Sequence, residues 1–254
     1  MKISGLILAK NEEDSIAEAL KCLEFADEII VLDQNSTDKT AQIAQKLGAK
    51  VLSSKIEQFD KNRNTLKELA KGEWLFYLDA DERVSKNNID EIKKAVNENK
   101  FPAYFFPRKN YILGKFLKHG GFYPDYVPRL FKKSRLMNWE GKVHESPKVD
   151  GKFGYLKEPI EHKTARSMKQ MLEKSTKWAK IEADLYDKKG TSKVNALKVL
   201  KFSFLEFIKR YFLKLGFLDG RVGLISTVYQ AIHNAMILTY LWEIQNDSQK
   251  TAST

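Results

Sequence analysis

The sequence contains little cysteine and lacks any long apolar run. Cys22 is the single cysteine among 254 residues, which excludes an intramolecular disulfide and fits a reducing compartment. Its apolar neighbours predict a buried small side chain rather than a nucleophile. The apolar run at the N-terminus meets charge at Lys10, too early for a signal peptide, and no run reaches the ~18 residues of a membrane span. We therefore expect a cytoplasmic protein.

Several chemical signatures are also missing. No Gly-x-Gly-x-x-Gly follows the first apolar segment and no Gly-x-x-x-x-Gly-Lys-Ser/Thr occurs, which argues against dinucleotide-dependent enzymes and P-loop ATPases. No set of Cys and His residues has zinc spacing. The four histidines are scattered along the chain, so spacing alone supports no catalytic triad.

Charge is abundant but uneven. The formal charge is +11, yet residues 1–100 carry 16 bases and 19 acids, whereas residues 101–254 carry 28 bases and 14 acids. The basic part should face something anionic: nucleic acid, a phosphorylated lipid or glycan, or a membrane surface.

The first hundred residues alternate between strand-like and helix-like patterns. Strands are predicted at residues 3–9, 28–32, 50–52 and 74–78, and helices at residues 11–22, 36–47, 60–71 and 87–97. Ser36 or Thr37 is the expected cap of the second helix, and Gly48 its end. This order predicts an α/β fold with a Rossmann-like, mostly parallel sheet, in which ligands bind beyond the carboxyl ends of the strands.

The remainder is different in character. Residues 101–160 are rich in aromatics, glycine and proline, and helical periodicity returns from residue 167. We predict an α/β domain that carries the ligand site at 1–165, a C-terminal helical region at 166–245 and a flexible tail at 246–254. Within the helical region, residues 194–215 form an amphipathic basic segment that could lie on a membrane surface, pack a helical subdomain or form an oligomer interface.

Carboxylates follow two of the predicted strands. The fourth strand leads directly into Asp79-Ala80-Asp81, and hard carboxylate oxygens at a sheet edge suit Mg²⁺ or Mn²⁺ held together with a diphosphate. The second strand ends at Asp33, where a carboxylate can accept from a ribose hydroxyl or a base N–H. Solvated loop acids and a helix-capping turn are the alternative interpretations.

The motifs together resemble the inverting family 2 glycosyltransferases of GT-A type, and among them the lipopolysaccharide-core glucosyltransferase-like branch. The matching segments, in order, are ILAKNEE at 7–13, VLDQNSTD at 31–38, KNRN at 61–64, GEWLFYLDADE at 72–82, GGFYPD at 120–125, RLF at 129–131, VHE at 143–145 and FLDGRVG at 217–223. The sequence departs from the family at Asn35, where glycine is usual; Asn tolerates the positive φ that the turn requires.

The resemblance implies a role for each matched residue. The nucleotide and donor sugar would be bound by Ala9, Glu12, Asp33, Arg63 and Asp79. A divalent metal would be held by Asp81 and His162, and Glu145 resembles a catalytic base. From residue chemistry, the acceptor-binding candidates are Tyr123 for stacking, Asp125, which is also the alternative base, and Arg129 for phosphates.

These features predict a metal-dependent inverting glycosyltransferase. The donor would be a UDP-linked nucleotide sugar, and the acceptor a cell-envelope glycan or lipid-linked glycan such as lipopolysaccharide core. The alternatives are a nucleotidyltransferase and a basic nucleic-acid-binding protein, although the acidic sheet edge argues against nucleic acid as a partner. The expected location is the cytoplasm, with or without peripheral contact with the inner face of the cytoplasmic membrane.

Overall fold

A computed structural model describes residues 2–141, 145–165 and 167–252. The chain forms two compact units. The first comprises Met1–Lys109 with Asp125–His162, and the second comprises Asn110–Pro124 with Lys163–Thr254. The predicted Val143 and His144 of the VHE motif lie outside the described residues.

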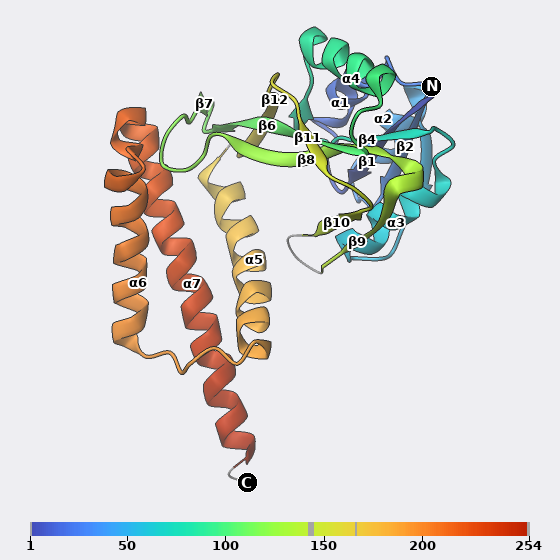
Figure 1. The fold of residues 1–254 in the computed structure, drawn as a ribbon. Helices are drawn as coiled ribbons and strands as arrows, with labels where there is room; N and C mark the ends of the chain where they lie inside the picture. Colours follow the sequence, from blue (N-terminus) through green and yellow to red (C-terminus); the bar gives the residue numbers. More distant parts are fainter. Residues whose placement is uncertain (1, 142–144, 166, 253–254) are drawn as a thin grey trace. The chain divides into compact units, whose positions relative to one another are not determined.

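The first unit is a sheet with helices on both faces (Figure 1). Its strands are β1 (Ile3–Ala9), β2 (Glu28–Asp33), β3 (Lys50–Ser53), β4 (Trp74–Tyr77), β5 (Glu82–Arg83), β6 (Ala103–Ile112), β8 (Asp125–Lys132), β9 (Leu136–Glu140), β10 (Ser146–Val149), β11 (Phe153–Tyr155) and β12 (Ile160–Ala165), of which β6 and β12 continue into the second unit. Its helices are α1 (Ile16–Cys22), α2 (Thr40–Lys46), α3 (Phe59–Leu69) and α4 (Lys86–Glu98).

The strand order is β3-β2-β1-β4-β8-β6-β12-β5, with β11 and β7 (Lys115–Phe116) paired to β6. The first four strands are parallel, whereas β8 runs antiparallel to both β4 and β6. Strands β9 and β10 form a separate antiparallel pair. Because β1, β2 and β4 are parallel, their carboxyl ends meet at one edge, where the predicted acids follow.

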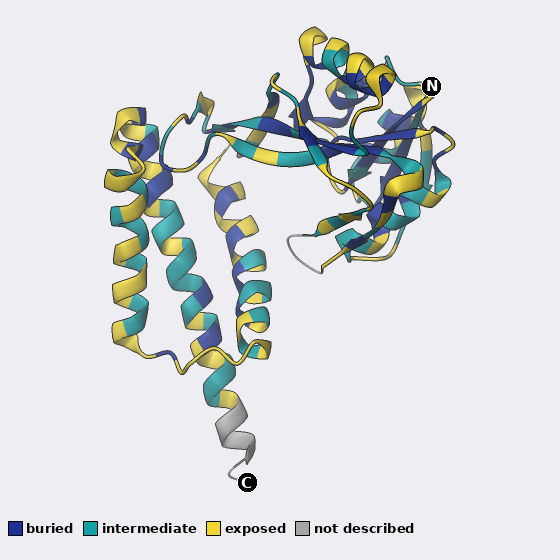
Figure 2. Cartoon of the chain, viewed as in Figure 1, coloured by how far each residue is buried: buried dark blue, intermediate teal, exposed yellow. Residues whose placement is uncertain are grey.

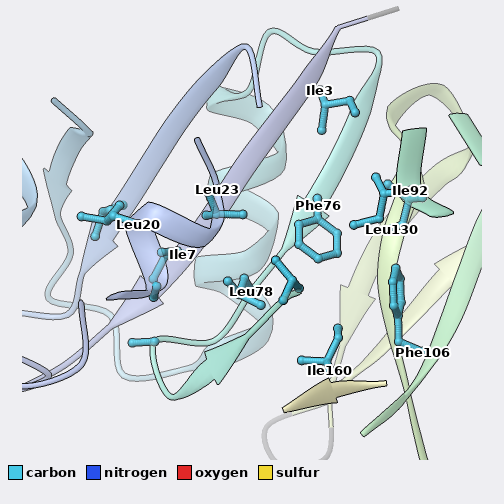
Figure 3. Packing of buried hydrophobic residues seen from close by; sticks show 14 of the residues in the cluster. Ile3, Ile7, Leu20, Leu23, Phe76, Leu78, Ile92, Phe106, Leu130 and Ile160 are labelled. Atoms are coloured by element: carbon cyan, nitrogen blue, oxygen red, sulfur yellow. The ribbon is translucent and has the colours of Figure 1, made fainter. Parts of the chain in front are cut away.

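Alternation along the strands explains why both faces of the sheet are covered. In β4, Phe76 packs into the cluster that α1, α2 and α4 cover, whereas Tyr77 packs into the cluster beneath α3. Figure 3 shows the first cluster, in which Phe76 lies between Leu23 of the α1 end and Leu130 of β8. Because side chains are buried on both faces, the sheet is rigid, and the loops at its edge begin from fixed strand ends.

Two helices begin later than the sequence predicted. The segment 11–15 is a loop, because Asn11 has a positive φ of 54° and the α1 helix begins at Ile16. Helix α2 begins at Thr40, so the prediction that Ser36 or Thr37 caps it was wrong: both hydroxyls bond within the loops instead. Gly48 follows α2 with φ of 82°, as expected of a helix end.

The second unit is mainly helical. It contains α5 (Met168–Lys188), α6 (Ala196–Ile208), a π-helical turn (Lys209–Leu213), a 3-10 turn (Gly216–Asp219) and α7 (Gly220–Ala252). Small and aliphatic side chains of α5 and α7 pack together, among them Ala179, Ala183 and Leu241. Helix α7 continues through residues 246–252, which were predicted as a flexible tail and contain neither glycine nor proline.

The predicted fold class, α/β with a Rossmann-like parallel sheet and a C-terminal helical extension, is confirmed. Strand β8, antiparallel to its neighbours β4 and β6, and strand β6 extend that sheet beyond the strands that the sequence pattern predicted. Across the described residues, none of the helices combines the length and the apolar character that a membrane crossing requires. Buried residues concentrate in the strands, while α6 has many exposed ones (Figure 2).

Candidate active site

Two loops at the carboxyl ends of β1 and β2 are tied together by hydrogen bonds. The main-chain N–H of Asn11 donates to Ser36 Oγ at 2.9 Å, and the Asn11 side-chain oxygen accepts from the N–H of Thr37 at 2.8 Å. One residue on, the N–H of Glu12 donates to Thr40 Oγ1 at 2.7 Å. Main-chain groups that α1 and α2 do not satisfy are thereby bonded by side chains of the opposite loop.

Ala9 and Asp33 are adjacent at this edge. They are the last residues of β1 and β2, they pair in register, and both are buried. The Asp33 carboxylate accepts from the Ser36 N–H at 3.0 Å and from Ser36 Oγ at 2.5 Å. Between them Asn35 has φ of 56°, so the positive φ predicted for this departure from glycine is confirmed. The Asp33 carboxylate thus closes a local turn with Ser36 and does not cap α2, which begins at Thr40, while base recognition stays a prediction.

Arg63 of α3 connects two of the predicted carboxylates. Its Nη2 donates to Asp79 Oδ1 at 3.1 Å and its Nε donates to Glu145 Oε1 at 3.0 Å. The guanidinium lies over the Trp139 ring, 4.8 Å from the centroid, and the whole residue is 5% exposed. Arg63 thus bonds a carboxylate 16 positions away in sequence and another 82 positions away.

Asp79 also contacts Arg129 of β8, whose Nη2 donates to both Asp79 and Glu82 Oε1. Burial alone would raise the pKa of Asp79, but the guanidiniums of Arg129, Arg63 and Arg108 lower it well below its usual range. The pKa of Arg129 is raised in turn: burial opposes its charge, but Asp79 and Glu82 outweigh that effect. Asp79 is therefore ionised throughout the physiological pH range.

Glu82 anchors this network although it is completely buried. Its Oε1 accepts from Arg129 at 2.6 Å and from Arg108 Nη1 at 3.2 Å, and its Oε2 accepts from the main-chain N–H of Asp79 at 3.2 Å. Arg108 continues to Asp125, donating from Nη2 at 2.6 Å. Buried charges of this kind are tolerated because each is paired and hydrogen-bonded.

Asp81 and His162 lie together, as the metal prediction requires. His162 Nε2 is 3.3 Å from Asp81 Oδ2, and both side chains are largely buried. The contact arises because β5 pairs antiparallel with β12, placing His162 opposite Glu82. Within the described part of the chain, no group of three or more His, Cys, Asp or Glu side chains is arranged to hold a metal ion.

Two of the three acceptor candidates belong to the charge network. Asp125 is bonded to Arg108, and Arg129 is 4% exposed and directed at Asp79 and Glu82 rather than at solvent. Tyr123 belongs to the second unit, where its ring meets Phe116 edge-on at 5.3 Å. Their roles in acceptor binding stay predictions.

Sequence reasoning missed Glu82 and Arg108, and it treated Trp139 as one of several aromatics that could stack on acceptor sugars rather than as a support for Arg63. The first two signals were weak: Glu82 directly follows Asp81, and Arg108 interrupts an aromatic strand. A charged residue inside an otherwise apolar strand is a useful sign of a buried partner.

Comparisons with known proteins show the family of this chain. The family model for glycosyl transferase family 2 matches residues 4–162. An uncharacterized glycosyltransferase of Rickettsia conorii is 29% identical over 265 residues, covering 95% of this chain and 90% of the relative. The poly(ribitol-phosphate) beta-N-acetylglucosaminyltransferase TarS of Staphylococcus aureus is 30% identical over 112 residues, 39% of this chain and 19% of that protein.

Among solved structures, S. aureus TarS 1-349 in complex with UDP-GlcNAc superposes with a TM-score of 0.52 at 15% identity. The superposition covers 99% of this chain and 92% of that one. At this identity the likeness shows the fold alone. The matched residues include those of the helical unit as well as those of the sheet.

Proposed function

Since the chain belongs to glycosyl transferase family 2, we propose that it transfers a sugar from a UDP-linked donor to a cell-envelope acceptor, with inversion at the anomeric carbon. The donor assignment is supported by the fold it shares with a protein whose structure contains UDP-GlcNAc. The nucleotide would lie at the edge formed by Ala9, Glu12 and Asp33, where ligands of parallel sheets bind.

The observation that carries this proposal is the bridge made by Arg63. Its guanidinium donates to Asp79, the predicted donor contact, at 3.1 Å and to Glu145, the predicted base, at 3.0 Å. Inverting transfer requires a leaving-group site and a base within one sugar ring of each other. A single rigid cation bonded to both carboxylates fixes that relationship.

Glu145 is proposed to accept the proton of the acceptor hydroxyl. As that oxygen attacks the anomeric carbon, the bond from the carbon to the diphosphate oxygen breaks and the nucleoside diphosphate leaves. The Arg63 hydrogen bond to Oε1 orients the carboxylate for this step. Arg63 also brings positive charge to the side on which the diphosphate departs.

The residues present fit a divalent ion, Mg²⁺ or Mn²⁺, at Asp81 and His162. A carboxylate oxygen and an imidazole nitrogen 3.3 Å apart are a suitable donor pair, and diphosphate oxygens would complete the coordination. When bound, the ion would neutralise charge that develops on the leaving diphosphate. Two protein ligands rather than three suit an ion that arrives with the nucleotide.

The acceptor is proposed to be an anionic or lipid-linked glycan, such as lipopolysaccharide core. Residues 101–254 carry twice as many bases as acids, which suits phosphate groups on the acceptor. TarS, which is similar to 39% of this chain, is named for poly(ribitol phosphate), a polymer that carries phosphate charge. The reaction is accordingly placed in the cytoplasm, at the inner face of the cytoplasmic membrane.

Calorimetric titration with UDP, in Mn²⁺ and in EDTA, tests the proposal. We expect Mn²⁺-dependent binding that weakens at least tenfold in Asp81→Asn and in His162→Gln. The matched control is Asp90→Asn, which makes the same change at an exposed position of α4 and should bind as wild type. A thermal-shift panel of nucleotide sugars would then identify the donor.

One result would overturn the proposal, and a second would remove the metal from it. Binding of duplex DNA in a parallel titration, without binding of UDP, would favour the nucleic-acid alternative. Equal UDP affinity in Mn²⁺ and EDTA would reject the metal site while leaving the donor assignment standing.

A further inference from the structure

Helix α6 exposes an apolar strip. Helix α6 packs against α7, yet none of the α6 side chains that the structure describes is buried. Leu197, Leu200 and Phe204 are 72%, 69% and 63% exposed, and their spacing of three and four places them on one helix face. Figure 2 shows α6 largely in the colours of exposed and intermediate residues. Isolated exposed hydrophobics are ordinary, whereas a continuous strip marks an interaction site.

Basic residues flank this strip. Lys198 and Lys201 follow Leu197 and Leu200 directly, and together with Phe204 these residues are called the α6 surface. Residues 194–218 contain five bases against a single acid, Glu206. The acid is already neutralised, since its carboxylate accepts from Arg210 Nε at 2.6 Å and from Lys209 Nζ at 3.5 Å. The segment therefore presents net positive charge beside apolar area.

We propose that the α6 surface docks on an anionic lipid bilayer, with its apolar strip in the headgroup region and its lysines on the lipid phosphates. Amphipathic basic helices bind bilayers in this way without crossing them. A second copy of the chain is a poorer occupant. Pairing two α6 surfaces about a two-fold axis would bring Lys198 and Lys201 close to their own copies, with Glu206 already paired.

Vesicle flotation of the full chain tests the proposal. We expect binding to phosphatidylcholine vesicles that contain phosphatidylglycerol, little binding to phosphatidylcholine alone, and loss of binding at high salt. The double variant Lys198→Glu/Lys201→Glu should lower partitioning at least tenfold. The variant Leu200→Gln/Phe204→Gln should lower it similarly, because both side chains are exposed and their replacement leaves the core intact.

The matched control is Lys177→Glu/Lys180→Glu on α5. It makes the same charge change at the same spacing, at exposed positions of the same unit. This control should bind vesicles as the wild type does, whereas the α6 surface variants should not. Circular dichroism of each variant verifies folding. Equal loss in the control, unchanged binding in the α6 variants, or a wild-type dimer by light scattering that the α6 variants convert to monomer would each overturn the proposal. Titration of the same variants with UDP measures nucleotide binding separately from vesicle binding.

Discussion

Asp79 and Glu145 share one guanidinium, that of Arg63, although they lie on different segments of the first unit. Arg63 is held in place by the Trp139 ring beneath it, and Asp79 is held from its other side by Arg129. Neither carboxylate can move without disturbing the other. The distance between the Asp79 carboxylate, the proposed donor contact, and the Glu145 carboxylate, the proposed base, is thus constrained by a salt-bridge network.

Replacing Arg63 with lysine should break this relationship. Lysine keeps the charge but is a compact point donor, and it cannot bond two carboxylates in the forked geometry of arginine. We expect the Kd for UDP to rise about tenfold and hydrolysis or transfer to fall about a hundredfold. Arg135→Lys is the control, because Arg135 is half exposed and pairs with Asp150 at the surface. Wild-type behaviour of the Arg63→Lys variant would contradict the bridging role.

Asp79→Asn should reveal the depressed pKa of Asp79 through stability. A carboxyl whose folded pKa lies below its unfolded value stabilises the fold above the unfolded pKa, and that contribution is lost as pH falls through the folded pKa. Urea unfolding at pH 7 should therefore show a loss on the order of 3 kcal/mol in the variant. The difference from wild type should shrink only below about pH 4. A difference that changes between pH 8 and pH 5 would contradict the assignment.

Glu82→Gln should weaken both stability and nucleotide binding. The buried carboxylate bonds two arginines and the main-chain N–H of Asp79, so its neutralisation leaves buried positive charge without full compensation. We expect a loss of about 3–5 kcal/mol on urea unfolding and weaker binding of UDP. Glu73→Gln, at an exposed position before β4, should change neither quantity.

Asn35→Ala should destabilise the turn after β2. Alanine keeps the Cβ that crowds the following carbonyl at φ of 56°, but it loses the polar side chain that lets asparagine tolerate this region, at a cost of about 1 kcal/mol. Asn35→Gly removes the Cβ altogether and should be neutral or slightly stabilising. Asn97→Ala in α4 is the comparison: at a helical position the same substitution should be neutral or slightly stabilising. Equal effects of Ala and Gly at position 35 would contradict the conformational explanation.

The sheet and its edge were predictable because their determinants are local. An apolar run that ends in Asp79-Ala80-Asp81 identifies a strand and its carboxyl end without further information. The start of α1 was not predictable. Glu12 and Glu13 resemble a first helical turn, yet their main-chain N–H groups bond Thr40 and Asp38, more than 20 residues away.

The charge network could not be derived from spacing. Arg129 lies 50 residues from Asp79 and Arg63 lies 82 residues from Glu145, and no periodic pattern links them. Their pairing follows from the antiparallel addition of β8 to β4 and from the return of the chain past α3. The charge of Arg129 therefore led to the prediction that it binds acceptor phosphates, whereas in the structure it pairs with the acids Asp79 and Glu82.

The tied loops after β1 and β2 carry a consequence for sequence divergence. Asn11 bonds Thr37, and Ser36 bonds both Asn11 and Asp33, so each loop is completed by side chains of the other. A substitution in one loop leaves a main-chain group of its neighbour without a partner. Positions 11, 36 and 37 should therefore change together among relatives, and paired replacement, rather than invariance of any one residue, is the expected evolutionary trace of this constraint.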